Sequence, residues 1–163
     1  RRSFIYAQKL GNMTPKPITY IEKRRHGLLY ESYYISQLSH CTHVLKEIIK
    51  DKEFPDRDAI FAAFGHFTAQ LHEQGMLHAD YSMGNVLFEP NEKGVDFQLV
   101  DLNRMRFGKK INCHKGCQNF ERIDTDAHAL SVIARAYAQA RGFDEEECVR
   151  LVLKMRWRKH KKN

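Results

Sequence analysis

Apolar residues recur at intervals of three and four between residues 56 and 75, which is the repeat of an amphipathic helix. Asp56 occupies the position of an N-cap residue, and Gly75 stands where the repeat ends. The repeat places large side chains on one face, which we interpret as core in preference to a cofactor site. Its members are Ile60, Phe61, Phe64, Phe67 and Leu71.

Four other segments have a helical pattern. The chain opens with the end of a helix that Gly11 stops, and an alanine-rich helix begins at Asp124 or Asp126 and ends at Gly142. Asp144, with acids in the turn that follows, opens a last helix. A short helix is predicted from one apolar face, made by Val44, Leu45, Ile48 and Ile49.

Strand patterns occur in two pairs. Residues 18–22 and 28–35 are rich in β-branched and aromatic side chains and are separated by a polar turn. Residues 86–89 and 95–100 are short apolar runs joined by a hairpin connection. Residues 108–124 have no repeat, so we predict a long loop, and compact domains usually reserve loops of this length for function.

Positive charge is concentrated at the C-terminus. The net charge is +7, and after Glu147 there are seven Lys and Arg residues and no acid. The rest of the chain is therefore balanced, which argues against a nucleic-acid groove. Two interpretations of the tail stay open: a solvated end, or a segment that places Met155, Trp157 and the neighbouring bases on an anionic membrane surface.

The four cysteines do not form a regular framework. The chain has no recognisable secretion signal and no apolar run of about 20 residues, so we expect a reduced, cytoplasmic protein without a transmembrane helix. Two groups contain potential zinc ligands without a standard spacing, and ordinary thiols are the favoured interpretation. These groups are His40, Cys41 and His43, and Cys113, His114 and Cys117.

A set of polar residues frames the second hairpin. His78, Asp80 and Asn85 form the pattern HxDxxxxN, and Asp101 follows the second strand. Because the strands pair antiparallel, the residues before the first strand and after the second lie at the same end of the hairpin. Asp80, Asn85 and Asp101 are therefore predicted to converge.

Phosphoryl transfer requires this combination of groups. A carboxylate orients the attacking hydroxyl and accepts its proton, while hard oxygen ligands hold the magnesium that bridges the phosphates. Each of these residue types alone is more often a turn or cap residue. Together, the three residues favour a phosphotransferase.

Two segments, LHADYSMGNVLF and FQLVDLNRMRFG, resemble the catalytic loop and the metal-binding strand of the protein-kinase-like fold. Within that superfamily the chain is most similar to the bacterial lipopolysaccharide core kinases, which phosphorylate inner-core sugars such as Kdo or heptose. This narrower resemblance depends on His78-Ala79-Asp80 in place of HRD and on Asp101-Leu102-Asn103-Arg104 in place of DFG.

The resemblance implies an α+β, kinase-like fold that consists mostly of the helical C-terminal lobe with its catalytic hairpin. Residues 1–35 would be a remnant of the N-terminal lobe, 36–155 the C-terminal lobe and 156–163 a basic tail. No glycine-rich loop or strand lysine of the family occurs before residue 12. We therefore expect a fragment of a kinase, which is weakly active or inactive by itself.

Carried over by position, the resemblance makes Asp80 the catalytic base, Asn85 and Asp101 ligands of magnesium and ATP, and His78 a buried support for the catalytic loop.

The resemblance also places the hinge at residues 28–33. The backbone at Glu31 and Tyr33 would then bind the adenine of ATP, and Leu87 would form the floor of the nucleotide site.

The acceptor is expected to be a sugar or a lipid-linked sugar. Ser82 stands where protein Ser/Thr kinases usually have lysine, which favours a small acceptor over a protein. Arg104 and Arg106 are candidates to bind an anionic acceptor, such as a carboxylated or phosphorylated sugar. The implied reaction is magnesium-dependent transfer of the ATP γ-phosphate to an inner-core sugar at the cytoplasmic face of the inner membrane.

Three other functions stay open on the sequence alone. A pseudokinase or scaffold would be consistent with the missing lysine, and a kinase could act instead on aminoglycoside-like small molecules or on proteins. A nucleic-acid-binding module is least favoured, because the aromatic and basic residues are assigned to helix faces and strands.

Overall fold

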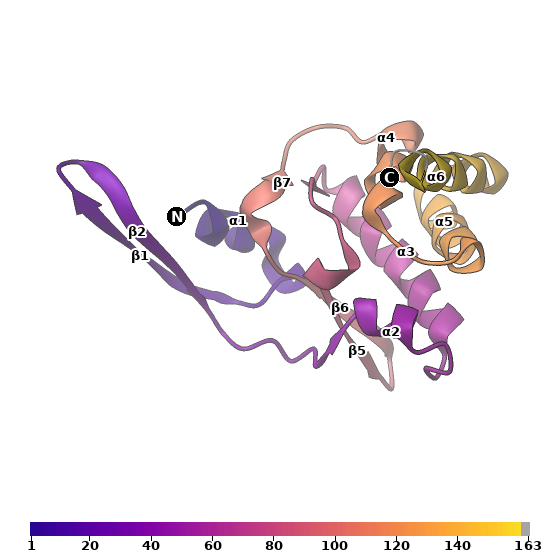
Figure 1. The fold of residues 1–163 in the computed structure, drawn as a ribbon, viewed down its shortest axis with the longest axis horizontal. Coiled ribbons are helices and arrows are strands. Elements are labelled where there is room, and N and C mark those ends of the chain that lie inside the picture. The colour runs from indigo at the N-terminus through magenta and orange to yellow at the C-terminus, as the bar shows by residue number, and fades with distance from the viewer. Residues whose placement is uncertain (161–163) are drawn as a thin grey trace.

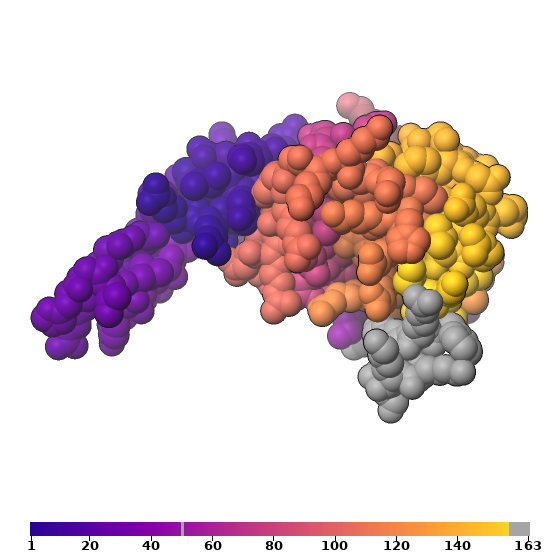
Figure 2. Space-filling view, turned by 90° about the horizontal axis from the view of Figure 1, so that it is seen from above, coloured from indigo at the N-terminus to yellow at the C-terminus, as the bar shows by residue number. Residues whose placement is uncertain are grey.

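The computed structural model describes residues 1–160, apart from the side chains of Lys50 and residues 157–160. The described chain has two unequal parts: a helix with a long two-stranded ribbon, and a larger group of helices around a hairpin (Figure 1). In the space-filling view the ribbon is a narrow arm beside the rounded bulk of the helices (Figure 2). None of the described helices is long and apolar enough to cross a membrane.

The N-terminal part consists of α1 (Arg2–Leu10), a turn of 3-10 helix at Gly11–Met13, and the antiparallel strands β1 (Pro17–Arg25) and β2 (Leu28–Ser36). Gly11 ends the helix with a φ of 57°, a conformation that costs glycine little. The helix end and both strands are confirmed, and β2 ends one residue past the expected N-terminal remnant.

The hairpin of the larger part is formed by β5 (Val86–Asn91) and β6 (Gly94–Leu99), as predicted. A short strand, β3 (His43–Val44), pairs with β5 and leads to α2 (Lys46–Lys50). The predicted helix over residues 44–49 is therefore wrong at its start, because the backbone of Val44 pairs with the sheet.

Two long helices form the centre of the larger part. These are α3 (Arg57–Glu73) and α5 (Ala127–Arg141), and α6 (Glu145–His160) packs beside α5 (Figure 1). All members of the predicted apolar stripe on α3 are buried, with exposed fractions of 8% or less. The interpretation of that face as core is confirmed.

Two of the predicted N-cap residues form side-chain cap hydrogen bonds, and a third does not. Asp126 and Asp144 accept hydrogen bonds from backbone N–H groups three residues ahead, at 2.8 and 2.7 Å. Asp56 makes no such bond because its backbone is left-handed, with a φ of 53°, and only its carbonyl accepts from Ile60. Side-chain capping by Asp56 was a wrong prediction, although α3 does begin after it.

Residues 108–124 are more ordered than predicted. They contain α4 (Cys113–Gln118) and the 3-10 turn η4 (Asn119–Arg122). Asn112 caps α4 by accepting from the backbone N–H of Lys115 at 3.0 Å. The segment has no apolar repeat because its few buried positions contact two different helices.

The basic tail begins inside a helix. α6 continues to His160 and so includes residues 156–160, and Met155 is only 6% exposed. Met155 belongs to the interior, which corrects its expected place on a membrane surface. The side chain of Trp157 and residues 161–163 lie outside the described part of the chain.

We predict that Gly65→Ala destabilises the protein by about 1–3 kcal/mol. A Cβ at Gly65 would lie 2.5 Å from the carbonyl oxygen of Ile133 and 2.9 Å from Cβ of Ala136, so α3 and α5 would have to separate. Urea unfolding measures the change. Gly84→Ala is the control, because the nearest atom to its added Cβ is 4.0 Å away; equal stability of both variants would contradict the prediction.

Candidate functional site

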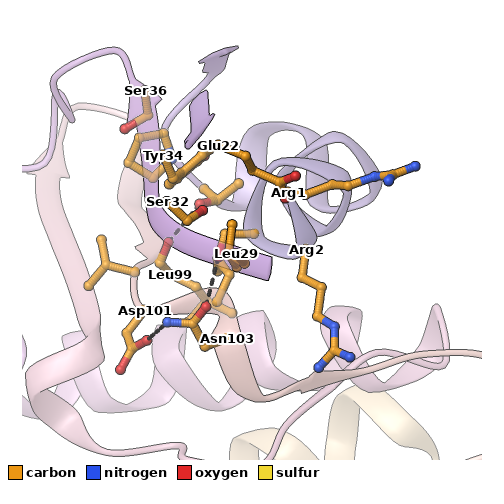
Figure 3. A pocket seen from close by; sticks show the side chains of 15 residues that line it. Arg1, Arg2, Glu22, Leu29, Ser32, Tyr34, Ser36, Leu99, Asp101 and Asn103 are labelled. Carbon is orange, nitrogen blue, oxygen red and sulfur yellow. Dashed lines mark hydrogen bonds between the residues drawn. The ribbon is translucent and has the colours of Figure 1, made fainter. Parts of the chain in front are cut away.

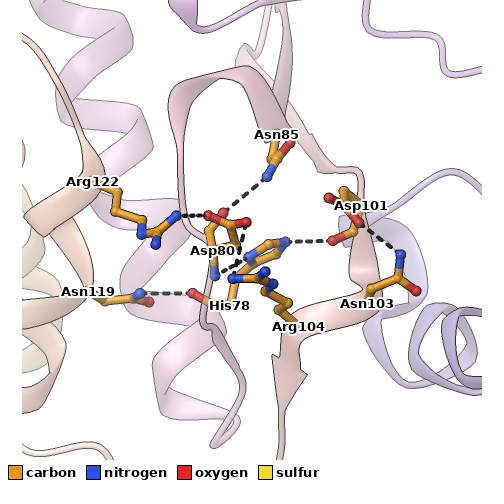
Figure 4. Close-up of polar contacts among 8 residues, drawn as sticks. All are labelled: His78, Asp80, Asn85, Asp101, Asn103, Arg104, Asn119 and Arg122. Atoms are coloured by element: carbon orange, nitrogen blue, oxygen red, sulfur yellow. Dashed lines mark hydrogen bonds and ion pairs between the residues drawn. The ribbon is translucent and has the colours of Figure 1, made fainter.

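His78 is the centre of the polar group (Figure 4). The side chain is fully buried, and its Nδ1 accepts a hydrogen bond from the backbone N–H of Asp80 at 3.1 Å. A backbone N–H can only donate, so the ring proton is on Nε2, which donates to the carbonyl oxygen of Asp101 at 3.0 Å. Burial lowers the pKa of His78 and keeps the ring neutral.

The hairpin brings the three predicted site residues together. The N–H of Val100 donates to the carbonyl oxygen of Asn85 at 3.0 Å, which places Asn85 beside the residue before Asp101. The side-chain Nδ2 of Asn85 donates in turn to the carbonyl oxygen of Asp80 at 3.0 Å. The predicted convergence of Asp80, Asn85 and Asp101 is confirmed as geometry, while their roles stay predictions.

A second pair of strands, which the sequence did not predict, precedes and follows the site residues and fixes the start of the catalytic loop. β4 (Leu77–His78) pairs with β7 (Met105–Arg106), and the N–H of Ala79 donates to the carbonyl oxygen of Arg104 at 2.9 Å. Between β6 and β7 the chain turns through Asp101, whose φ is 53°. The turn leaves the Asp101 carboxylate exposed.

Two arginines approach the carboxylate of Asp80. Arg122, at the end of η4, donates from Nη1 to Oδ1, and Nη1 of Arg104 lies 3.8 Å from Oδ2 (Figure 4). The Asp80 side chain is 23% exposed, so a substrate hydroxyl can reach it. Arg104 was expected to meet an acceptor, whereas the contact of Arg122 was not predicted.

A series of three hydrogen bonds in the interior connects the helices to the backbone of this loop. The hydroxyl of Tyr137 lies 3.0 Å from Nδ1 of His72, and Nε2 of His72 lies 3.0 Å from Oδ1 of Asn119. The Nδ2 of Asn119 donates to the carbonyl oxygen of His78 at 2.9 Å. Sequence reasoning missed all three residues; the only available signal was the length of the segment that contains Asn119.

The direction of the chain of bonds follows from Asn119. Because its Nδ2 donates to His78, its Oδ1 accepts from Nε2–H of His72, and Nδ1 of His72 accepts from the Tyr137 hydroxyl. Burial lowers the pKa of His72 to about 4. The neutral ring therefore belongs to the folded state at ordinary pH.

A cleft of about 810 Å³ lies between the N-terminal part and the hairpin (Figure 3). The face of β2 that carries Ser32, Tyr34 and Ser36 forms one wall, and Asp101 and Asn103 lie at the opposite wall. Oδ1 of Asp101 accepts from Nδ2 of Asn103 at 3.1 Å.

The structure places Glu31 and Tyr33 inside a strand and not at the connection between the two parts, while the expected contact of their backbone with adenine stays a prediction. Both lie in the middle of β2, paired with Lys23 and Ile21 of β1, and alternation along the strand turns them away from the cleft. The Tyr33 hydroxyl donates to Glu31 at 2.8 Å instead. The connection between the two parts is residues 37–42, after β2.

Leu87, the expected floor of the nucleotide site, lies in β5 with a half-buried side chain. Its two neighbours in the strand, Val86 and Phe88, are fully buried and point the other way.

A smaller pocket of about 220 Å³ opens on the other side of the catalytic loop. Its lining includes Ala79 and Tyr81, which flank Asp80, and three basic residues against one acid, Glu121; the basic residues are Arg106, Lys115 and Arg122. The pocket therefore suits an anionic molecule close to Asp80. Ser82 is not in this lining; its N–H donates to the carbonyl oxygen of Asp80 at 2.9 Å in a tight turn.

The oxygen atoms at the hairpin end fit a magnesium ion. Nδ2 of Asn85 is occupied by the Asp80 carbonyl, which leaves its Oδ1 free, and the Asp101 carboxylate is exposed toward the cleft. An amide oxygen and a carboxylate are hard ligands of the kind that magnesium prefers.

We predict that His72 makes folding stability depend on pH. Its folded pKa lies below the ordinary value of 6.5, so its contribution is present above about pH 6.5 and is lost as the pH falls toward 4. The loss is on the order of 3 kcal/mol. Urea unfolding at pH 6.5 and at pH 4 measures the loss of unfolding free energy between the two conditions. This loss should be smaller in His72→Gln than in the wild type and unchanged in the exposed control His114→Gln. Equal losses in all three proteins would refute the assignment.

Comparison with known proteins agrees with this geometry. Among solved structures the chain is similar to WaaP in complex with acyl carrier protein, with a TM-score of 0.71, 16% identity, and coverage of 99% of this chain and 75% of that one. Ribosomal protein S6 kinase alpha-1 of Homo sapiens is 24% identical over 115 residues, which are 69% of this chain and only 15% of that protein. The structural likeness, at this level of identity, shows a shared kinase-like fold.

The sequence profile of one family extends over most of the chain. It is described as the lipopolysaccharide kinase (Kdo/WaaP) family, and the match covers residues 6–141. The matched range contains His78, Asp80, Asn85 and Asp101 as well as the segment that carries Arg122. The chain therefore belongs to the lipopolysaccharide kinase (Kdo/WaaP) family.

Proposed function

We propose that the protein is a magnesium-dependent kinase that transfers the γ-phosphate of ATP to a hydroxyl of a lipopolysaccharide inner-core sugar. The observation that carries the proposal is the convergence of Asp80, Asn85 and Asp101 at one end of the hairpin, where a buried histidine holds the backbone of two of them. Membership of the family supports a kinase that acts on lipopolysaccharide.

In the proposed reaction, Asp80 orients the sugar hydroxyl and accepts its proton as the bond to phosphorus forms. Asn85 and Asp101 would hold magnesium, which when bound would neutralise charge on the phosphates. Arg104 and Arg122 lie beside the Asp80 carboxylate, where negative charge on a transferring phosphoryl group would be stabilised.

The two openings give the substrates separate places. ATP fits the larger cleft, because Asp101 forms part of its wall. The acceptor fits the smaller basic pocket beside Asp80. ATP use favours the cytoplasm, and a lipid-linked acceptor would bring the enzyme to the inner membrane.

Asp80→Asn should lower the rate of phosphate transfer from ATP to lipopolysaccharide core acceptors by a factor on the order of 10² to 10⁴, because the amide cannot accept the proton. The measurement uses the full-length protein with magnesium. Asp96→Asn, at an exposed carboxylate on β6, is the control and should keep full activity. Equal rates for Asp80→Asn and wild type would remove Asp80 as the base, and no transfer by folded wild type would favour another acceptor or a pseudokinase.

Arg106→Ala should raise the acceptor KM about tenfold and leave the KM for ATP unchanged, because Arg106 lines the acceptor pocket and not the larger cleft. Steady-state kinetics with each substrate varied in turn separate the two effects. Lys93→Ala removes an exposed positive charge from the turn of the β5–β6 hairpin and should change neither constant. A rise in the ATP KM alone would place Arg106 in the nucleotide site.

A further inference from the structure

Three cysteines that are distant in sequence meet between α4 and α6. Cys113 and Cys117 are one helical turn apart on α4, and Cys148 lies in the first turn of α6. All three Sγ atoms are within 4.8 Å of one another, and those of Cys113 and Cys148 are 3.4 Å apart. The sequence suggested a different group, with His114 in place of Cys148, and the structure corrects it.

The arrangement matches a soft metal site. Zinc binds thiolate sulfur at about 2.3 Å in tetrahedral geometry, which separates the sulfur atoms by roughly 3.8 Å. The observed sulfur positions bracket that separation. Two of the three cysteines, Cys117 and Cys148, are fully buried, so their side chains are already oriented inward.

We propose that Cys113, Cys117 and Cys148 bind one zinc ion. Each thiol gives its proton to solvent as its sulfur binds the metal, so Zn²⁺ and three thiols yield a zinc trithiolate with one net negative charge and three released protons. Water occupies the fourth position and reaches it beside Cys113, which is partly exposed. The zinc would connect α4 to α6, and no redox change is involved.

The surroundings of the cluster favour a fixed site. A Cβ at Gly116 would collide with the hydroxyl of Tyr137, so this glycine allows α4 to lie against the Tyr137 side chain of α5. Arg141 donates from Nη2 to the carbonyl oxygen of Ile111 at 2.9 Å, two residues before Cys113.

A metal at this place would position part of the proposed active site. α4 has only six residues, too few to be stable by itself, and it continues directly into η4. η4 carries Asn119 to the His78 carbonyl and Arg122 to Asp80. Zinc would tie this segment to α6 at a point remote from the reacting atoms, so the cysteines act as positioning residues.

The full-length protein is purified under reducing conditions, loaded with zinc and dialysed. Inductively coupled plasma mass spectrometry should then find one zinc per chain. Cys113→Ser and Cys148→Ser should lose it. Cys41→Ser, at a buried cysteine outside the cluster, is the matched control and should keep it. Asp80→Asn should also keep it, so failure of the proposed kinase activity and failure of this site are distinguishable.

Cobalt(II) provides a second readout that does not depend on activity. The wild type should show an intense near-ultraviolet thiolate-to-cobalt band, weakened in Cys113→Ser, whose exposed position makes that variant the least disturbing to the fold. Circular dichroism verifies folding. Absence of stoichiometric zinc in the folded, reduced wild type overturns the proposal. Zinc that is retained by both Cys113→Ser and Cys148→Ser also overturns it. A disulfide between Cys113 and Cys148 that forms in preference to metal binding is the third contradicting result.

Discussion

The site depends on one buried imidazole that joins two backbone segments. His78 accepts from the N–H of Asp80 and donates to the carbonyl oxygen of Asp101, so a single ring fixes the distance between the expected base and an expected metal ligand. Protonation of Nδ1 would break the bond from Asp80, and rotation of the ring would break both bonds, in each case leaving a buried polar group unsatisfied. The lowered pKa that burial imposes on His78 therefore belongs to the same constraint, because only the neutral ring can accept from Asp80.

The support of that ring comes from the helices. The hydroxyl of Tyr137 on α5, His72 on α3 and Asn119 on η4 form a directed series of hydrogen bonds that ends on the backbone of His78. Because the series begins on α5 and α3, which pack closely at Gly65, the position of the catalytic loop depends on how these two helices pack. The position of the loop that carries Asp80 thus depends on residues of α3, α5 and η4.

The catalytic loop separates two environments with different chemistry. On one side Asp101 faces a large cleft that leads to β2, and on the other side Arg106 and Arg122 line a small basic pocket. Asp80 stands between them, with its carboxylate beside two arginines. This division is the basis on which we proposed separate places for nucleotide and acceptor, and it is consistent with the family to which the chain belongs.

The sequence by itself determined the elements that local rules specify: the apolar face of α3, the cap at Asp144, and the hairpin that brings Asn85 beside the residue before Asp101. Antiparallel pairing makes that last contact follow from strand order alone. The sequence left the cap of α5 open between Asp124 and Asp126, and the structure selects Asp126. Tertiary structure decided the rest. Which face of β2 meets the cleft depends on strand register, and the contacts of Arg122, Asn119 and Cys148 join residues more than 30 positions apart, where no short-range pattern exists.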